Sequence, residues 1–393
     1  MEHLLRRTWA EIDLDAARYN YEYISSRLRP GCRLMAVVKA NAYGHGIEGI
    51  ARIYDEMGAE WFAVSNLEEA VQLRRLGLRQ RILILSYTPP QEAARLAEYH
   101  VTTAVVDLEH ARALNDCAAA CGVQLTVHLK LDTGMTRVGF SSVDGAAQAA
   151  SLPWLKAEGI FTHFAAADTP SEDGYTRAQF ARFCEMIEAL ERRGIRFALR
   201  HCCNSAALMR FPEMHLDMVR PGIILYGCRP DTAMSEIWPL QTVMSLRTTV
   251  SQVKEIAAGT TVSYGRTYQA DRNMRLATVP IGYADGYPRL VSNRAQMAVG
   301  NRRVAVVGRV CMDQAMLDVT GCDDVIPGSI VTVFGRELPA EELADWAQTI
   351  AYEILCLVGR RVPRLFFRDG RAVGTSNMLT ADPSDGYCPT TES

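Results

Sequence analysis

Lys39 follows an unbroken apolar run, residues 34–38, and precedes a turn-forming run, residues 41–46. This pattern predicts a buried strand that ends in a primary amine. A partly desolvated lysine has a lowered pKa, and its neutral amine can form an imine with a carbonyl compound. A lysine at a strand end can also extend its amine into solvent, which is the more common outcome by composition alone. The spacing around Lys39 therefore leaves covalent chemistry and simple solvation both open.

Further polar residues end the other apolar runs of the first half of the chain. They are Lys130 with Asp132, His163, His201 with Asn204 and Ser205, and Arg220. In a barrel of parallel strands, the C-terminal strand ends form one rim, and the active site lies at that rim. One charged strand end is usually solvated, whereas five polar strand ends on one rim favour a functional site.

Strands and helices alternate over roughly the first 230 residues. Apolar runs typical of strands occupy residues 33–38, 61–65, 81–86, 102–106, 124–131, 159–164, 196–201 and 217–226. Apolar residues at three- and four-residue spacing predict helices at 66–77 and 176–194, each ended by a glycine. Eight such strands predict an α/β fold with an N-terminal (β/α)8 TIM-type barrel. A doubly wound sheet, the alternative, usually shows GxGxxG after its first strand, and none follows the first strand here.

The pattern changes after about residue 238, where short strand-like runs are separated by glycine turns and one helix is predicted at 341–361. We therefore expect a barrel domain at 1–238 and a C-terminal β-rich domain at 239–380. The polar residues 381–393 are predicted to be a mobile tail.

Composition narrows the function classes. The chain has 393 residues, a formal net charge of -3 and 48% hydrophobic residues. These values give no overall attraction to nucleic acid or to an anionic membrane. No apolar run reaches the roughly 20 residues that span a bilayer, and no secretory signal is evident. The eleven cysteines lack CxxC pairs, which favours reduced thiols and a cytoplasmic location.

Nine sequence blocks, in the same order, resemble bacterial alanine racemases, which depend on pyridoxal 5'-phosphate. The blocks are AVVKANAYGHG, KLDTGMTRVGF, GIFTHFAAAD, HCCNSAA, MVRPGIILYG, VSYGRTY, PIGYADGYPR, GRVCMDQ and YEILC. The resemblance extends over residues 8–364. It implies a (β/α)8 barrel followed by a β-rich domain. It also implies an isomerase that interconverts L-alanine and D-alanine, supplies D-alanine for peptidoglycan, and acts as a homodimer with shared active sites.

The resemblance assigns two bases to opposite faces of the substrate. Lys39 would bind the cofactor covalently and then act as one base, and Tyr264 of the partner subunit would be the other. His163 would be a positive neighbour that stabilises the Tyr264 phenolate. Arg220 would face the pyridine nitrogen, where most enzymes of this cofactor have a carboxylate. Taken alone, Tyr264 could pack in a sheet, His163 could be a structural histidine, and Arg220 could bind a backbone carbonyl.

The resemblance also assigns the remaining site residues. The phosphate would be bound by Tyr43, Ser205, Tyr352 and the backbone amides of Gly222 and Ile223. Arg137 would hold the substrate carboxylate side, and Lys130 matches a lysine that is often carbamylated in this family. Met312 would offer its amide to the substrate carboxylate, with the catalytic residue Asp313 beside it. Tyr283 and Arg289 would line the substrate corridor, and no His/Cys cluster suggests a metal.

Three other functions compete with this interpretation. An amino-acid decarboxylase of the same scaffold would need a glycine-rich phosphate loop and a late catalytic cysteine, and we find no such loop. A single-domain pyridoxal-phosphate carrier protein has no β-domain with a residue like Tyr264. A serine or broad-specificity amino-acid racemase stays open, because a small pocket rejects an added hydroxyl only weakly.

Overall fold

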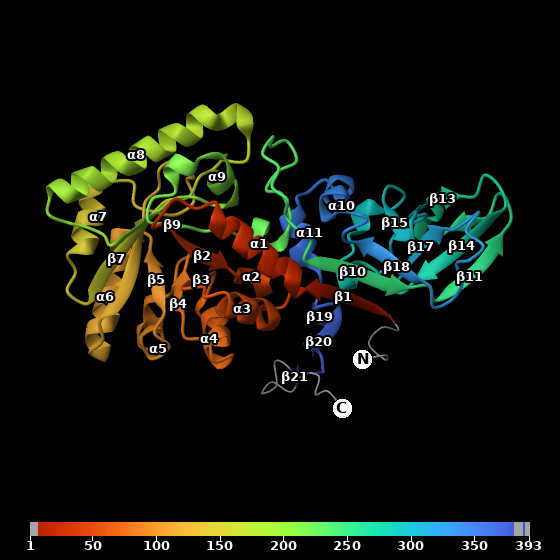
Figure 1. Cartoon of the computed structure of the whole chain (residues 1–393), viewed down its shortest axis with the longest axis horizontal. Coiled ribbons are helices and arrows are strands. Elements are labelled where there is room, and N and C mark those ends of the chain that lie inside the picture. The colour runs from red at the N-terminus through yellow and green to blue at the C-terminus, as the bar shows by residue number, and fades with distance from the viewer. Residues whose placement is uncertain (1–6, 381–387, 390–393) are drawn as a thin grey trace.

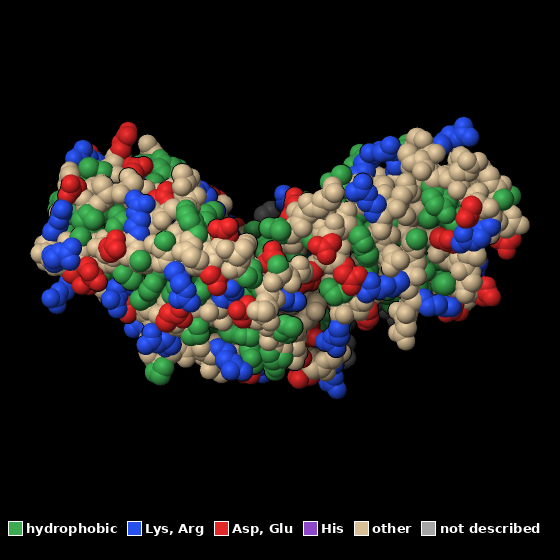
Figure 2. All heavy atoms as spheres, turned by 90° about the horizontal axis from the view of Figure 1, so that it is seen from above, with side chains coloured by type: hydrophobic (Ala, Val, Ile, Leu, Met, Phe, Trp, Pro, Cys, Tyr) green, Lys and Arg blue, Asp and Glu red, His purple; other side chains and the backbone are tan. Residues whose placement is uncertain are grey.

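The computed structural model describes residues 7–380 and 388–389. Figure 1 shows an elongated molecule, with a barrel at one end and β-sheets at the other. In Figure 2 a broad concavity in the outline separates these two ends.

Eight parallel strands form the barrel, in the order β8-β7-β6-β5-β4-β3-β2-β9. They are β2 (Arg33–Val37), β3 (Trp61–Val64), β4 (Arg81–Ile84), β5 (Thr102–Val105), β6 (Leu125–Lys130), β7 (Leu155–Phe161), β8 (Leu199–His201) and β9 (Met218–Val219). Backbone hydrogen bonds from Asp217 to Arg200 (3.2 Å) and from Arg220 to Cys203 (3.0 Å) join the two end strands, so the ring closes. The predicted (β/α)8 barrel is confirmed.

Helices cover the outside of this barrel (Figure 1). They are α1 (Leu14–Ser26), α3 (Ile47–Glu56), α4 (Leu67–Arg75), α5 (Ala93–Glu98), α6 (Leu108–Cys121), α7 (Val143–Ala150), α8 (Asp173–Arg192) and α9 (Ser205–Arg210). Asn66 caps α4 by accepting the Glu69 amide at 2.9 Å. The two predicted terminal glycines, Gly77 and Gly194, have φ values of 84° and 80°, the left-handed conformation that ends a helix.

The eighth barrel strand is much shorter than predicted. Residues 217–226 read as one strand, but only Met218–Val219 pair in the sheet. Pro221 has no N–H for a further ladder bond, and the chain then forms a 3-10 helix, Ile223–Tyr226. This early end of the strand places Gly222 and Ile223 at the barrel mouth.

The C-terminal part contains three sheets, the largest in the order β16-β15-β18-β10-β1-β19-β20-β21. Its strands are β1 (Thr8–Asp13), β10 (Met244–Thr249), β15 (Gln296–Val299), β16 (Arg302–Ala305), β18 (Ile330–Phe334), β19 (Arg364–Arg368), β20 (Arg371–Ser376) and β21 (Cys388–Pro389). The smaller sheets are β11 (Gln252–Ile256), β14 (Met274–Val279) and β17 (Ala315–Asp318), and β12 (Thr261–Val262) with β13 (Tyr268–Gln269). The predicted β-rich part is confirmed, and β1 belongs to its sheet, between β10 and β19. The boundary at residue 238 stays a prediction.

The single helix predicted at 341–361 is wrong, because two helices occupy this segment. They are α10 (Ala340–Ala347) and α11 (Ala351–Leu357). Gln348 adopts a φ of 55° and ends α10, and Ile350 is extended before α11 begins. The break lets α11 turn toward the barrel, where it lies between the barrel and the C-terminal sheets (Figure 1).

The predicted mobile tail, 381–393, lies outside the described residues except for Cys388–Pro389, which pair with β20. Among residues 7–380 and 388–389, no helix has both the length and the apolar character that crossing a membrane requires. The ten cysteines whose side chains the structure describes are all free thiols, as the sequence predicted for reduced cysteines.

Candidate active site

Lys39 begins a left-handed turn directly after β2. The turn is α2 (Lys39–Tyr43), and residues 40–43 have φ values from 52° to 54°. Each left-handed residue costs about 1–2 kcal/mol, so neighbouring groups must hold this turn. Glu69 accepts the Ala40 amide at 2.7 Å, and Asn41 accepts the Ile47 amide at 2.8 Å. A Cβ on Gly44 would lie 2.2 Å from the Leu355 carbonyl oxygen, so only glycine fits there.

The surroundings of Lys39 favour its neutral amine. Burial lowers the pKa of Lys39, and the nearby Arg137 guanidinium lowers it further, against a smaller opposing effect of Glu69. A lowered pKa makes more of the amine nucleophilic at neutral pH. The strand-end lysine is therefore half-buried and activated rather than simply solvated.

Arg220 is the most completely bonded cation of the site. It is 3% exposed and donates to the carbonyls of Thr162 (2.8 Å) and Cys202 (3.1 Å) and to Nδ1 of His201 (2.8 Å). Burial lowers the pKa of Arg220 to about 10, so the guanidinium stays charged at neutral pH. The sequence placed His201 on the rim, but this ring is fully buried inside the barrel.

His163 lies beside Arg220 at the end of β7, with its Nδ1 3.4 Å from Arg220 Nη2. Burial and the nearby charges of Arg220, Arg137, Lys130 and Lys39 hold the pKa of His163 well below its usual range. The imidazole is therefore neutral at pH 7 in this chain. His163 was expected to be a positive neighbour of Tyr264, but the positive charge belongs to Arg220 behind it.

Uncharged hydrogen-bond donors form a separate cluster at the barrel mouth. The Gly222 amide donates to Ser205 Oγ at 2.9 Å, and a Cβ on Gly222 would lie 2.5 Å from the Tyr43 hydroxyl. The ring centroids of Tyr43 and Tyr352 are 6.0 Å apart. Burial raises the pKa of both phenols, so each keeps the proton that it can donate. The missing Cβ lets the Tyr43 hydroxyl approach the Gly222 backbone, and with the Ile223 amide beside Gly222 this donor set fits a phosphate.

Lys130 and Arg137 form a further pair of basic residues at the barrel mouth. Lys130 is buried at the end of β6, with Nζ 5.7 Å from the Phe161 ring centroid. Burial and the nearby Arg137 and Arg220 lower the pKa of Lys130 to about 8. Arg137 is exposed in the following loop, where Asp132 accepts the amides of Gly134 and Thr136, each at 3.0 Å.

The remaining predicted residues form a second group in the C-terminal part. Tyr264 is 69% exposed, Met312 is 52% exposed and Tyr283 is 44% exposed. One loop joins them, because Ser263 Oγ donates to the Arg309 carbonyl at 2.7 Å and the Tyr283 amide donates to the Cys311 carbonyl at 3.1 Å. Arg289 is exposed at the start of a short 3-10 helix, and Asp313 accepts from Arg361 at 2.7 Å.

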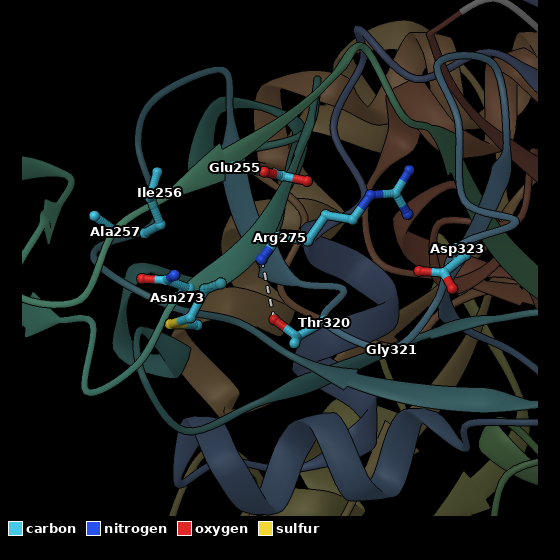
Figure 3. Close-up of a pocket in the computed structure, with 9 residues that line it drawn as sticks. Glu255, Ile256, Ala257, Asn273, Arg275, Thr320, Gly321 and Asp323 are labelled. Atoms are coloured by element: carbon cyan, nitrogen blue, oxygen red, sulfur yellow. Dashed lines mark hydrogen bonds between the residues drawn. The ribbon is translucent and has the colours of Figure 1, made fainter.

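The fold brings each group together but keeps the two groups apart. In Figure 1, α2 lies against the barrel, whereas β13, next to Tyr264, lies at the far end of the C-terminal sheets. A hollow of about 470 Å³ on these sheets includes none of the predicted residues. Figure 3 shows Glu255, Arg275 and Asp323 at its edge and the Arg275 amide bonded to Thr320. Another hollow, of about 500 Å³, has Tyr264 and Cys311 in its wall.

Sequence reasoning missed two supports of the site. His128 is fully buried, with Nδ1 2.9 Å from His201 Nε2. It precedes Lys130 by two residues, and this period-two spacing predicts that both side chains point into the barrel. Arg364 of β19 is buried and donates to the carbonyls of Gly44, Gly359, Val362 and Val358. No sequence pattern marks Arg364 as a buried support, because it looks like an ordinary charged residue at the start of a strand.

Comparisons with known proteins agree with this geometry. Residues 12–230 match the family model of the alanine racemase N-terminal domain, and residues 243–366 match that of the C-terminal domain. The chain is 47% identical over 364 residues to an alanine racemase of Desulforamulus reducens, over 91% of this chain and 98% of that protein. It is 45% identical over 365 residues to an alanine racemase of Desulfovibrio desulfuricans, over 92% and 98% of the two chains.

Solved structures give the same result for the fold. The crystal structure of the Bacillus anthracis alanine racemase with bound L-Ala-P has a TM-score of 0.90 and 36% identity, over 95% of this chain and 98% of that one. The Clostridium difficile 630 alanine racemase in complex with cycloserine has a TM-score of 0.87 and 35% identity, over 95% and 98%. Both halves of this chain are therefore covered by relatives of one kind, and the chain belongs to the alanine racemase family.

Proposed function

We propose that this chain interconverts L-alanine and D-alanine with pyridoxal 5'-phosphate, as a homodimer in which each site takes its second base from the partner subunit. The observation that carries the proposal is the position of Lys39. Lys39 is half-buried at the barrel mouth and has a lowered pKa, and the same mouth holds the buried cation Arg220 and a set of uncharged hydrogen-bond donors. The family to which the chain belongs supports the same reaction.

The barrel residues divide the binding of the cofactor among them. Lys39 would bind it covalently, Tyr43, Ser205, Tyr352 and the amides of Gly222 and Ile223 would hold its phosphate, and Arg220 would lie on the side of its ring nitrogen. When bound, pyridoxal phosphate acts as an electron sink that makes the α-proton of an amino acid acidic. Arg220 is buried and already bonded to two carbonyls, so it donates a hydrogen bond and accepts no proton.

Racemisation requires proton transfer on both faces of the α-carbon. The Lys39 amine would move the proton on one face once the substrate amine has taken its place on the cofactor. Tyr264 of the partner subunit moves it on the other face, with the charge of Arg220 favouring the phenolate. The exposure of Tyr264 supports this assignment, because a base that worked within its own chain would be covered by that chain.

The other predicted residues position the substrate. Arg137 holds the substrate carboxylate side, the Met312 amide approaches from the partner with Asp313 beside it, and Tyr283 and Arg289 line the corridor. Lys130 reacts with CO2 to form a carbamate and release a proton, which requires the neutral amine. Its pKa of about 8 makes this amine available near neutral pH. The carbamate then neutralises Arg137. A cytoplasmic location and a supply of D-alanine for peptidoglycan complete the proposal.

Subunit mixing tests the proposal. Lys39→Ala and Tyr264→Phe proteins should each be inactive alone, and their mixture should regain activity because each hybrid dimer has one site with neither substitution. Racemisation is followed by polarimetry with L-alanine, D-alanine and L-serine as separate substrates. Isotope-labelled subunits, resolved by native mass spectrometry, verify that exchange has occurred. Exchanged hybrids without activity would contradict the shared site. Faster racemisation of serine than of alanine would show that serine is the preferred substrate.

A further inference from the structure

A line of polar side chains crosses the barrel interior behind Arg220. Arg220 Nη1 lies 2.8 Å from His201 Nδ1, and His201 Nε2 lies 2.9 Å from His128 Nδ1. His128 Nε2 lies 3.9 Å from Glu158 Oε2, and Arg81 pairs with the same carboxylate oxygen. Both imidazoles are fully buried. Because Arg81 is the first residue of β4, the line connects the active-site rim with the opposite end of the barrel.

The chemistry of the groups gives this line one direction. Arginine only donates, so His201 Nδ1 accepts and the ring proton lies on Nε2. That Nε2–H donates to His128 Nδ1, which therefore also accepts. The proton of His128 then lies on its Nε2, which forms no hydrogen bond within the described residues and lies 3.9 Å from the Glu158 carboxylate. The hydrogen-bonded line therefore begins with a permanent donor, Arg220, and ends at His128, whose N–H lies near an anion.

The charge states agree with this direction. Burial, with the nearby Arg220 and His128, holds the pKa of His201 well below its usual range. Burial likewise lowers the pKa of His128. His128 and Arg81 lower the pKa of Glu158 to about 2, so its carboxylate is charged at neutral pH. Both rings are neutral between one fixed cation and one fixed anion.

The barrel wall is shaped around the two rings. The register between β6 and β7 shifts at His128, so that Val127 pairs with Ala157, His128 pairs with Gly159, and Glu158 has no paired residue on β6. Such bulges redirect a side chain and are frequent near active sites. A Cβ on Gly159 would lie 2.6 Å from the His128 ring, so a larger residue would displace it. Phe161 stacks on His201, with ring centroids 4.9 Å apart and an interplanar angle of 2°.

We propose that His128 and Glu158 are positioning residues of the racemase, which hold His201 in its Nε2–H tautomer and thereby hold the Arg220 guanidinium against the cofactor ring. This inference rests on the proposed role of Arg220. Without an acceptor at position 128, the buried Nε2–H of His201 loses its partner. The ring can then regain one only by rotating away from Arg220.

The first test reads the tautomers without reference to activity. The wild-type protein, labelled with ¹⁵N-histidine, should show His128 and His201 as neutral rings with the proton on Nε2 throughout pH 6–8. His128→Asn and His201→Asn proteins assign the two signals. A proton on Nδ1 of either ring, or a doubly protonated ring at pH 7, would overturn the inference.

The second test compares two substitutions at the same position. His128→Leu removes the acceptor, whereas the side-chain oxygen of His128→Asn replaces Nδ1. His128→Leu should lower kcat about tenfold in both directions while KM for alanine changes less than about twofold. His128→Asn should restore kcat to within about threefold of the wild type. Equal loss in the two variants would show a merely structural role and overturn the inference.

His110→Leu is the matched control. His110 is also buried and bonds the Thr88 carbonyl at 2.9 Å, but it belongs to α6 on the outside of the barrel. This control should lose stability and keep the wild-type kcat and both tautomers.

If His128→Leu does not fold, Glu158→Gln and Glu158→Ala replace the pair. The glutamine keeps a side-chain oxygen near His128 Nε2–H, and only the alanine variant should lose kcat. An inactive wild-type protein with ordered tautomers would contradict the proposed function. An active wild-type protein in which either ring carries its proton on Nδ1 would contradict this inference alone.

Discussion

Within the barrel, Lys39, Arg220 and the phosphate donors are buried or half-buried and are bonded to their neighbours, whereas Tyr264, Met312 and Tyr283 of the C-terminal part are exposed. The residues of the barrel group follow the ends of strands that backbone hydrogen bonds join into a closed barrel. The C-terminal group is held by one loop, and its side chains face away from the chain's own core. These exposed side chains are the ones that the partner subunit would cover in the proposed dimer.

Because the two groups lie in different parts of the chain, a substitution in one group should leave the structure of the other unchanged. In the proposed function, the barrel group would bind the cofactor within one chain, and the C-terminal group would act in the site of a second chain.

Lys39→Ala should lower racemisation about 10²–10⁴-fold or more in both directions, because both covalent binding and one base are lost. The urea midpoint should stay close to the wild type, since the amine is half-buried and the barrel core does not contain it. Borohydride reduction of the wild type, followed by peptide mapping, should label Lys39. A label on Lys130 would contradict the assignment.

Tyr264→Phe should affect one face of the substrate only. In deuterated water the variant should keep slow exchange of the α-proton of D-alanine through Lys39, and it should lose about 10²-fold or more of the exchange on L-alanine. Proton NMR measures both rates. Stability should not change, since the ring is exposed. Equal loss for the two enantiomers would indicate that one base serves both faces.

Arg364→Met should destabilise the connection between the two parts by about 2–4 kcal/mol in urea unfolding, because four carbonyls lose a buried charged donor. One of these carbonyls belongs to Gly44, after the Lys39 turn. Arg368→Met on the same strand is the control. Arg368 forms a half-exposed ion pair with Glu56 at 3.0 Å, and its loss should cost less than about 1 kcal/mol. Similar losses in both variants would contradict a special role of Arg364.

Lys130→Met should change the pH dependence of stability by about 1 kcal/mol or more. The pKa of Lys130 is lowered from 10.5 to about 8, so between these values the unfolded chain binds more protons. Stability from this group therefore rises with pH across that window and is lowest below pH 8. In CO2-free buffer the methionine variant should gain more over the wild type at pH 7 than at pH 9.5, by urea unfolding. An equal difference at both pH values would mean that the buried amine is not charged at pH 7.

The sequence determined most of the fold and the types of residue at the site. The period of the apolar runs gave eight barrel strands and the change to β-structure, because burial of alternate faces is a local property of the chain. Lys39, Lys130 and Arg220 could be placed at strand ends for the same reason. The nine ordered blocks then gave each of them a role by resemblance.

Only the tertiary structure decided which groups touch. Pro221 ended the eighth strand, Gln348 broke a helix, and β1 joined a sheet whose other strands begin more than 200 residues later. The lowered pKa of His163 depends on its burial and on basic side chains from separate strands and loops, and the line from Arg220 to His128 depends on two histidines 73 residues apart. Charges and hydrogen bonds act through space rather than along the chain, so no local pattern in the sequence could reveal them.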